Sequence, residues 1–318
     1  MILRQLENRK AGRYMNSQKT TSSDHLPDLP LLGLQFMNCT ASYAQADVIL
    51  FGAPFDSTAS FRPGSRFGPA AMRQDSLSLE TYSPYQDYEL PADKICDIGD
   101  LELPAGSVPA ALERIRRAVC QVLDDHKMPV ILGGEHLVTL PAIEACQERW
   151  PDLCVLHFDA HADLRSDYLG ESLSHATVMR RVWDLLGDGR IWQFGIRSGT
   201  RDEFLFARDG HVRMNAFSLT GLEAAIGEIG SRPVYLTIDL DVLDPSVFPG
   251  TGTPEPGGVD FPSLLQALLR LGQVNLVGAD LVELAPHYDP SGISTAAALK
   301  VLRELLISRF ADQCGRHV

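Results

Sequence analysis

Short apolar runs alternate with longer stretches of helical periodicity over most of this 318-residue chain. The apolar runs occupy 48–54, 130–134, 154–158, 190–198, 234–241 and 274–283, and the helical patterns occupy 111–125, 141–150, 263–272 and 295–310. Runs of this kind are typical of parallel strands that are buried on both faces, and their alternation with helices is typical of βαβ units. The sequence therefore predicts an α/β fold: a single three-layer α/β/α domain with a mostly parallel sheet.

The same alternation sets the expected domain boundaries. No linker interrupts it between residues 46 and 310, so one domain fits better than two. Residues 1–44 are polar and rich in Ser, Thr and Pro, which predicts an N-terminal tail, and residues 45–318 are expected to form the domain.

The composition excludes several classes of partner. The net charge is −13, which repels a phosphate backbone and attracts small cations, so nucleic acid is not an expected partner. No segment resembles a signal peptide or approaches the 18 apolar residues of a membrane span. The six cysteines lack CxxC pairs. We therefore expect a cytoplasmic protein with reduced cysteines and no membrane partner.

Three of the apolar runs end in residues that bind metals. Asp159, His161 and Asp163 follow the run 154–158 at alternate positions, which share one side of extended backbone. Taken alone, this motif is equally compatible with a solvated acidic turn. Asp239 and Asp241 end the run 234–241.

The third motif places Glu135 and His136 after the run 130–134. Buried carboxylates need partners, and ligands bind at the carboxyl ends of the strands in open α/β sheets. Four aspartates and two histidines at one edge suit a pair of Mn²⁺ ions, although Co²⁺, Ni²⁺ or Zn²⁺ would compete for such ligands. Paired metals of this kind activate water for hydrolysis.

The motifs LGGEH, FDAHAD and IDLDVLDP, in this order and at these separations, resemble those of the ureohydrolase family. The resemblance covers residues 46 to 310, including RPGSRFGPAAMR, GIRSG, GTGTPEPGG and GADLVELAP. It implies an arginase-like fold, a ureohydrolase catalytic domain and two Mn²⁺ ions per chain. The implied metal ligands are His136, Asp159, His161, Asp163, Asp239 and Asp241, with Asp159 and Asp239 bridging the two ions.

The resemblance also implies three catalytic residues. His175 matches the histidine that transfers protons, and Glu283 matches the carboxylate that pairs with the guanidinium group. Asp163 is expected to steady the tetrahedral intermediate in addition to its role as a ligand. His157 is interpreted as structural, and Asp97 and Asp100 are expected to organise a loop after a strand, without a catalytic role.

The expected reaction is hydrolysis of a guanidino group to urea and an amine, with agmatine giving putrescine in polyamine biosynthesis. The segment from Asp163 to His175 is similar to that of bacterial agmatinases, and it is expected to form one wall of the substrate entrance. Its acidic residues Asp167 and Glu171 favour a substrate tail that ends in an amine. Arg165 stands where arginases carry an asparagine that contacts the substrate carboxylate, so 4-guanidinobutyrate remains an alternative, as do aminopropylagmatine and arginine.

Two hypotheses of other classes remain. The arginase-like fold is shared with deacetylases that use a single zinc ion, but such enzymes do not need all six ligands. A non-catalytic regulatory subunit would not need His175 and Glu283. The family resemblance further implies a homotrimer or a homohexamer.

Overall fold

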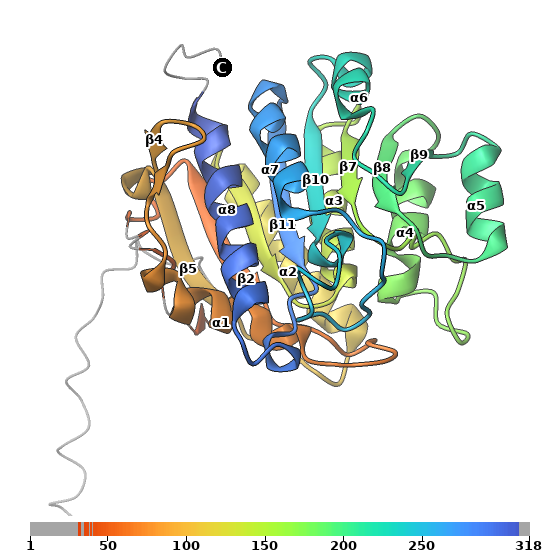
Figure 1. Cartoon of the computed structure of the whole chain (residues 1–318), viewed down its shortest axis with the longest axis horizontal. Helices are drawn as coiled ribbons and strands as arrows, with labels where there is room; N and C mark the ends of the chain where they lie inside the picture. Colours follow the sequence, from red (N-terminus) through yellow and green to blue (C-terminus); the bar gives the residue numbers. More distant parts are fainter. Residues whose placement is uncertain (1–30, 33–34, 38, 40, 312–318) are drawn as a thin grey trace, which may run out of the picture.

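A nine-stranded sheet runs through the described residues of the computed structural model, which are 31–32, 35–37, 39 and 41–311. Its strand order is β1-β5-β2-β6-β11-β10-β7-β8-β9, and all neighbouring strands are parallel except β1 and β5 (Figure 1). The strands are β1 (Leu31–Leu32), β2 (Val48–Ala53), β5 (Ile95–Leu101), β6 (Met128–Gly133), β7 (Cys154–Phe158), β8 (Ile191–Ile196), β9 (Arg213–Ala216), β10 (Val234–Asp239) and β11 (Leu276–Val282). A separate hairpin is formed by β3 (Tyr82–Ser83) and β4 (Tyr88–Glu89).

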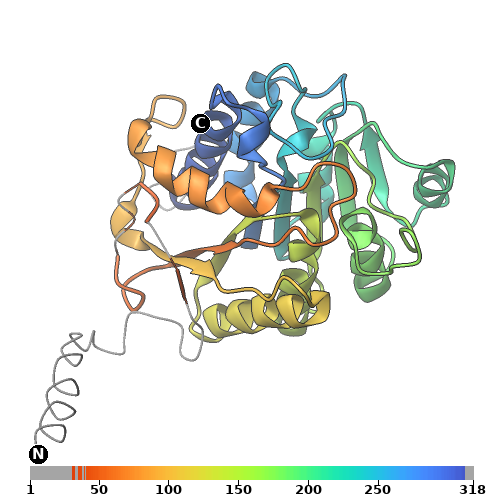
Figure 2. The same ribbon diagram turned by 90° about the horizontal axis from the view of Figure 1, so that it is seen from below.

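Helices cover both faces of this sheet. The helices whose buried side chains pack on one face are α2 (Val108–Asp124), α3 (Thr139–Arg149), α4 (Val178–Leu186) and α5 (Arg201–Arg208). Those that pack on the other face are α1 (Gly68–Asp75), α6 (Leu222–Ile229), α7 (Phe261–Arg270) and α8 (Ile293–Ala311). Figure 2 shows the orange and blue helices on one side of the sheet and the yellow helices on the other. The predicted three-layer α/β/α architecture is confirmed.

The central strands are apolar throughout because each of their faces meets a helical layer. In β2, Val48 and Leu50 belong to the core under α7 and α8, whereas Ile49 and Phe51 belong to the core under α2 and α3. Successive side chains of a strand point to opposite faces, so a strand between two cores needs an apolar residue at every position. This requirement explains the continuous apolar runs in the sequence.

The predicted runs coincide with six strands and four helices to within a few residues. The elements that the sequence analysis did not predict are β1, β3, β4, β5, β9, α1, α4, α5 and α6. The placement of Asp97 and Asp100 in a loop is wrong, because both lie within β5. Asp97 is fully buried there and accepts hydrogen bonds from Arg73 and from the backbone N–H of Phe36. A charged residue inside a strand was mistaken for the end of that strand.

The folded region begins before the boundary predicted at residue 45. β1 pairs with β5, and Phe36, Met37 and Cys39 are buried in the core. Residues 1–30, where most of the predicted tail falls, lie outside the described residues. Five cysteines lie within the described part of the chain, and all five are free thiols. No helix in that part is long and apolar enough to cross a membrane.

A buried ion pair fixes β5 to α1. Arg73 is almost completely buried, and its guanidinium donates to Asp97 at 2.8 Å and 2.9 Å and also pairs with Asp100. Because Asp97 also holds the backbone of Phe36, this one carboxylate joins three separate segments. A buried charge that loses its partner is expensive, so the pair should matter for stability.

We expect Asp97→Ala to lower the free energy of unfolding by about 3 kcal/mol, because the mutation leaves the Arg73 guanidinium with Asp100 as its single acidic partner. Urea denaturation measures the change. Glu148→Ala breaks the exposed pair between Arg116 and Glu148 and should cost less than about 1 kcal/mol. Equal costs in the two variants would contradict this interpretation.

Candidate metal centre

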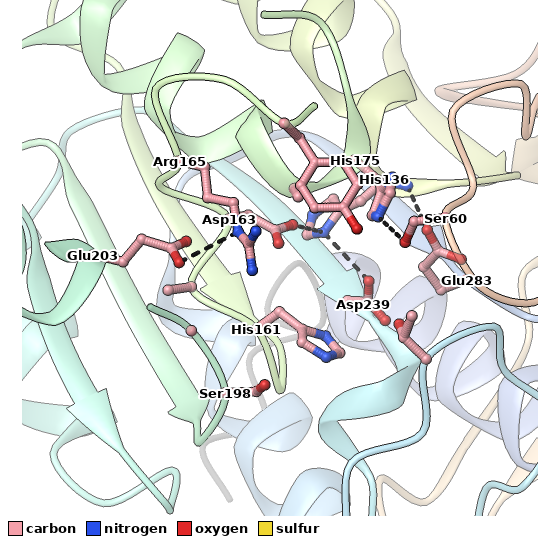
Figure 3. A pocket seen from close by; sticks show the side chains of 15 residues that line it. Ser60, His136, His161, Asp163, Arg165, His175, Ser198, Glu203, Asp239 and Glu283 are labelled. Carbon is pink, nitrogen blue, oxygen red and sulfur yellow. Dashed lines mark hydrogen bonds and ion pairs between the residues drawn. The ribbon is translucent and has the colours of Figure 1, made fainter. Parts of the chain in front are cut away.

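Four strands that are adjacent in the sheet bring the metal-ligand motifs to one edge. In the order β6, β11, β10 and β7, their carboxyl ends lead to His136, Glu283, Asp239 and Asp159. Parallel strands end at the same edge, so residues far apart in the sequence become neighbours there (Figure 3). All three sequence motifs therefore meet in one place.

The ring of His136 lies at the centre of three carboxylates. Its Nδ1 atom is 3.0 Å from Asp159 Oδ2, 3.1 Å from Asp163 Oδ2 and 3.3 Å from Asp239 Oδ2. All four residues are buried, and Nδ1 has no hydrogen-bond partner of acceptable geometry among the described residues. An unpartnered ring nitrogen that faces three carboxylate oxygens is the arrangement expected around a cation.

His161 forms the second half of the cluster. Its Nδ1 atom is 3.1 Å from Asp241 Oδ2 and 3.5 Å from Asp159 Oδ1. The backbone N–H of Asp241 donates to Asp239 Oδ1 at 2.9 Å. Asp159 therefore faces both histidines, with one carboxylate oxygen directed to each. The bridging position that the family resemblance implies for Asp159 stays a prediction.

Hydrogen bonds behind the cluster orient the His136 ring. Its Nε2 atom is 3.0 Å from Thr237 Oγ1, and the Thr237 hydroxyl lies 2.6 Å from Asp280 Oδ1. The hydroxyl donates its single proton to Asp280, so it accepts from Nε2, and Nδ1 is the ring nitrogen that faces the three carboxylates. Metal-binding histidines are commonly held by such a partner on the second ring nitrogen.

His157 has a similar relation to Asp159. Its Nε2 atom is 2.8 Å from Asp159 Oδ2, and its Nδ1 atom is 3.0 Å from the side-chain amide nitrogen of Gln193. That amide nitrogen also donates to the carbonyl of Ala162, which fixes the orientation of the amide. Nδ1 therefore accepts, and Nε2 donates to the carboxylate. His157 is buried, and it orients a residue of the cluster. With His136 and Asp159 it forms a group whose atoms lie close enough together to hold a metal ion, so its structural role stays a prediction.

The crowding of carboxylates changes their protonation. Burial, followed by the charge of Asp159, raises the pKa of Asp163 to about 7, and burial with the charge of Asp241 raises the pKa of Asp239 well above its usual range. Burial opposes a charge on His136, but the neighbouring carboxylates of Asp159, Asp163 and Asp239 raise its pKa well above the ordinary value. The cluster therefore needs positive charge. Four carboxylates and two imidazoles fit divalent transition-metal ions.

Two carboxylate residues of the site, one in the cluster and one beside it, have unusual backbone conformations. Asp163 has φ +54° and Glu283 has φ +65°, in the left-handed region that side chains other than glycine rarely adopt. Both residues line the cavity beside the cluster. Strained backbone of this kind is found mainly at functional sites.

A cavity of about 220 Å³ opens beside the cluster. Its lining residues are Ser60, His136, His161, Ala162, Asp163, Arg165, Tyr168, His175, Ala176, Ser198, Gly199, Glu203, Asp239, Thr253 and Glu283. Both His175 and Glu283 therefore line the cavity. Asp159 and Asp241 lie behind this lining.

Glu283 is a buried carboxylate without an ion pair to a lysine or arginine among the described residues. One of its oxygens accepts from the backbone N–H of His136 at 2.9 Å. Burial, followed by the charge of Glu135, raises the pKa of Glu283 well above its usual range. A cation in the cavity would relieve this unfavourable environment.

The predicted entrance residues divide into two groups. Arg165 lines the cavity, with its Nε atom 3.7 Å from the buried Glu203 and its guanidinium 5.0 Å from the Tyr168 ring. Asp167 and Glu171 are exposed and do not line the cavity. Asp167 instead accepts from the backbone N–H of Gly170 within its own turn.

Several lining residues were not predicted. Ser60 and Tyr168 carry no sequence signal that separates them from ordinary loop residues. Ser198 and Thr253 lie in the segments GIRSG and GTGTPEPGG, which resemble the family, but neither residue was assigned a role. Glu203 follows Thr200 at the spacing of a helix capping box, which the structure contains, but that motif indicates only the start of a helix.

The fold and the site together define an α/β protein with an acidic, histidine-containing centre suited to divalent cations. The family profile described as "Arginase family" matches residues 46–308. The chain belongs to the arginase family, and it is a ureohydrolase. A protein named agmatinase from Halalkalibacterium halodurans is 46% identical over 278 residues, covering 86% of this chain and 96% of the relative.

Two further relatives show how far the similarity extends. The crystal structure of an agmatine ureohydrolase of Thermoplasma volcanium has a TM-score of 0.82 and 34% identity, covering 90% of this chain and 98% of that chain. A protein from Thermococcus kodakarensis named N(1)-aminopropylagmatine ureohydrolase is 39% identical, covering 80% of this chain and 89% of the relative.

We expect Mn²⁺ at about 100 times its Kd to stabilise the protein by about 2.7 kcal/mol, because the ion binds the folded cluster and not the unfolded chain. Asp239→Asn should lose most of this gain. Without metal, the same variant should melt at the wild-type temperature or above it, because it relieves repulsion between buried carboxylates. Thermal melts with and without Mn²⁺ measure both effects.

The matched control is Asp93→Asn, which neutralises an exposed aspartate on a short 3-10 helix away from the cluster. It should respond to Mn²⁺ as the wild type does. A wild-type protein whose melting temperature does not respond to Mn²⁺ would contradict the assignment.

Proposed function

We propose that this ureohydrolase cleaves agmatine to putrescine and urea with two Mn²⁺ ions per chain. The observation that carries the proposal is Glu283, a buried carboxylate that lines the cavity beside the metal cluster and pairs with no lysine or arginine among the described residues. A guanidinium is planar and forms paired hydrogen bonds with a carboxylate, so it fits this position.

The proposed metal ligands are the six residues of the cluster. His136, Asp159, Asp163 and Asp239 would hold one ion, and Asp159, His161, Asp239 and Asp241 would hold the other. Two divalent cations bound there would supply Lewis-acid activation of a water molecule. Their charge balances the four aspartates and leaves Glu283 for the guanidinium.

Three side chains of the cavity are assigned the other steps of the proposed reaction. Glu283 orients the guanidinium carbon for attack, and Asp163 accepts a hydrogen bond from the attacking oxygen and steadies the tetrahedral intermediate. His175 delivers a proton to the leaving amine. Burial, followed by the charge of His161, lowers the pKa of His175 to about 4, so its ring is neutral at pH 7 and can accept a proton before it donates one.

The surroundings of Arg165 favour a substrate tail without a carboxylate. Arg165 is the one lysine or arginine among the described residues that line the cavity, and it faces Glu203 and stacks on Tyr168. The lining also contains Asp163, Asp239 and Glu283. A carboxylate tail would have to compete with Glu203 for Arg165, which disfavours arginine and 4-guanidinobutyrate. The relative named agmatinase supports the same choice.

Asp167 and Glu171 are proposed to act on the substrate only through the negative charge that they add near the entrance, since neither lines the cavity. A longer cation such as aminopropylagmatine is the second candidate, and the name of the Thermococcus kodakarensis relative supports it. We also propose that the enzyme works in the cytoplasm and supplies putrescine for polyamine biosynthesis, as a homotrimer or homohexamer of the kind that the family resemblance implies.

Initial rates of urea release from agmatine, arginine, 4-guanidinobutyrate and aminopropylagmatine test the proposal. We expect kcat/KM for agmatine to exceed that for arginine by at least roughly 100-fold, or about 2.7 kcal/mol of transition-state discrimination. Chelation should abolish urea release, and Mn²⁺ should restore it. A higher kcat/KM on either carboxylate-bearing compound would overturn the choice of agmatine.

Glu283→Gln removes the charge of the proposed guanidinium anchor but keeps its shape. We expect kcat/KM for agmatine to fall by roughly 100-fold, because an amide loses the charge-assisted hydrogen bonds that orient the substrate. Glu113→Gln, which removes an exposed charge on α2, is the control and should match the wild type. Wild-type kcat/KM in Glu283→Gln would show that the guanidinium binds elsewhere.

A further inference from the structure

The loop after β2 contains a threonine that the proposed reaction does not use. Thr58 donates its backbone N–H to Glu135 Oε2 at 2.8 Å, and its hydroxyl lies 2.6 Å from Glu135 Oε1. Glu135 is buried, and its own backbone N–H donates to the carbonyl of Phe55 at 2.7 Å. The residue next to the ligand His136 therefore fixes Thr58 through both carboxylate oxygens.

A glycine permits this close approach. Gly134 donates its backbone N–H to Ala53 at 2.9 Å, and a Cβ atom at this position would collide with the carbonyl oxygen of Phe55. The loop after β2 therefore lies directly against the end of β6. Thr58 consequently has a fixed position relative to the metal cluster.

Thr58 contacts His175 at two points. Its Oγ1 atom accepts from the backbone N–H of His175 at 3.1 Å and lies 3.3 Å from His175 Nδ1. A hydroxyl has one proton, and the shorter contact gives that proton to Glu135, so Thr58 acts as an acceptor toward Nδ1. The second neighbour of Nδ1, Ser174 Oγ, is farther away, at 3.4 Å. The shorter contact with Thr58 therefore favours a proton on Nδ1.

The other nitrogen of the His175 ring faces the cavity. Its Nε2 atom is 3.2 Å from the hydroxyl of Ser60, and Ser60 lines the cavity whereas Thr58 does not (Figure 3). With the proton on Nδ1, Nε2 carries the lone pair and accepts from Ser60. The reactive nitrogen is thus on the side where the substrate would lie.

We propose that Thr58, anchored by Glu135, is a positioning residue that fixes the His175 ring with its proton on Nδ1 and its Nε2 lone pair toward the cavity. This inference deepens the proposed function and rests on the role of His175 in proton transfer. Hydrolysis moves both protons of one water from oxygen to the leaving nitrogen, as the C–O bond forms and the C–N bond breaks. Nε2 carries protons in these transfers, and the ring is neutral before and after each one.

Removal of the Thr58 hydroxyl tests the proposal. In the Mn²⁺-loaded enzyme, Thr58→Val keeps the shape of the side chain and should lower kcat for agmatine by about tenfold, a part of the 10²–10⁴-fold contribution of a proton-transfer group. KM and the number of bound metal ions should stay within twofold of the wild type. Thr58→Ser retains the hydroxyl and should restore most of kcat. Ser57→Ala removes the neighbouring hydroxyl, which donates to Ala105, and should have no effect.

Crystal structures of the same loaded variants give a second measurement that does not depend on activity. The His175 ring should keep its position in Thr58→Ser and should rotate or lose order in Thr58→Val. Wild-type kcat and an unmoved ring in Thr58→Val would overturn the proposal, as would equal losses of kcat in the two variants. A wild-type enzyme that releases no urea would instead contradict the proposed function, and the ring positions would then decide the inference separately.

Discussion

The repulsion among buried carboxylates at one edge of the sheet is the constraint on which this structure depends. Asp159, Asp163 and Asp239 surround one ring nitrogen of His136, Nδ1, at 3.0 to 3.3 Å, and all three carboxylates are buried. Such a cluster costs stability unless positive charge occupies it. The parallel sheet makes the cluster possible, because the rigid ends of four neighbouring strands hold the carboxylates together despite their repulsion. The stability of the sheet therefore offsets the unfavourable free energy of the carboxylate cluster.

Hydrogen bonds from buried side chains of the sheet hold this charged centre in place. Thr237 links His136 to Asp280, and Gln193 holds His157, which donates to Asp159. Each of these series of hydrogen bonds comes from the buried sheet, so the opposite side of the ligand residue stays free. Rotation of the His136 ring would break its hydrogen bond to Thr237 inside the core, where water does not replace it. The geometry is therefore set before a metal ion binds.

The sequence was most informative where the contacts are local. His161 and Asp163 were predicted because they follow a buried strand directly, and the capping box at Thr200 would have predicted a helix start. Contacts between distant segments leave no such pattern. Nothing near Thr58 indicates that it meets a histidine 117 positions later, and nothing near Arg165 indicates that Glu203 faces it. Asp97 was misplaced for the same reason, because its partner Arg73 comes from another element.

The backbone conformations of Asp163 and Glu283 show how the site departs from what stability alone would select. Both residues adopt positive φ at the point where the chain leaves the sheet edge, a conformation that glycine adopts at lower cost. Glycine would remove the carboxylate that each position contributes to the cavity. The strain persists because surrounding contacts fix the backbone: Glu283 donates its N–H to Gly134, and the carbonyl of Asp163 accepts from Arg180. Both carboxylates are consequently directed at the cavity by backbone that these contacts hold in place, which is the condition for orienting a small planar cation.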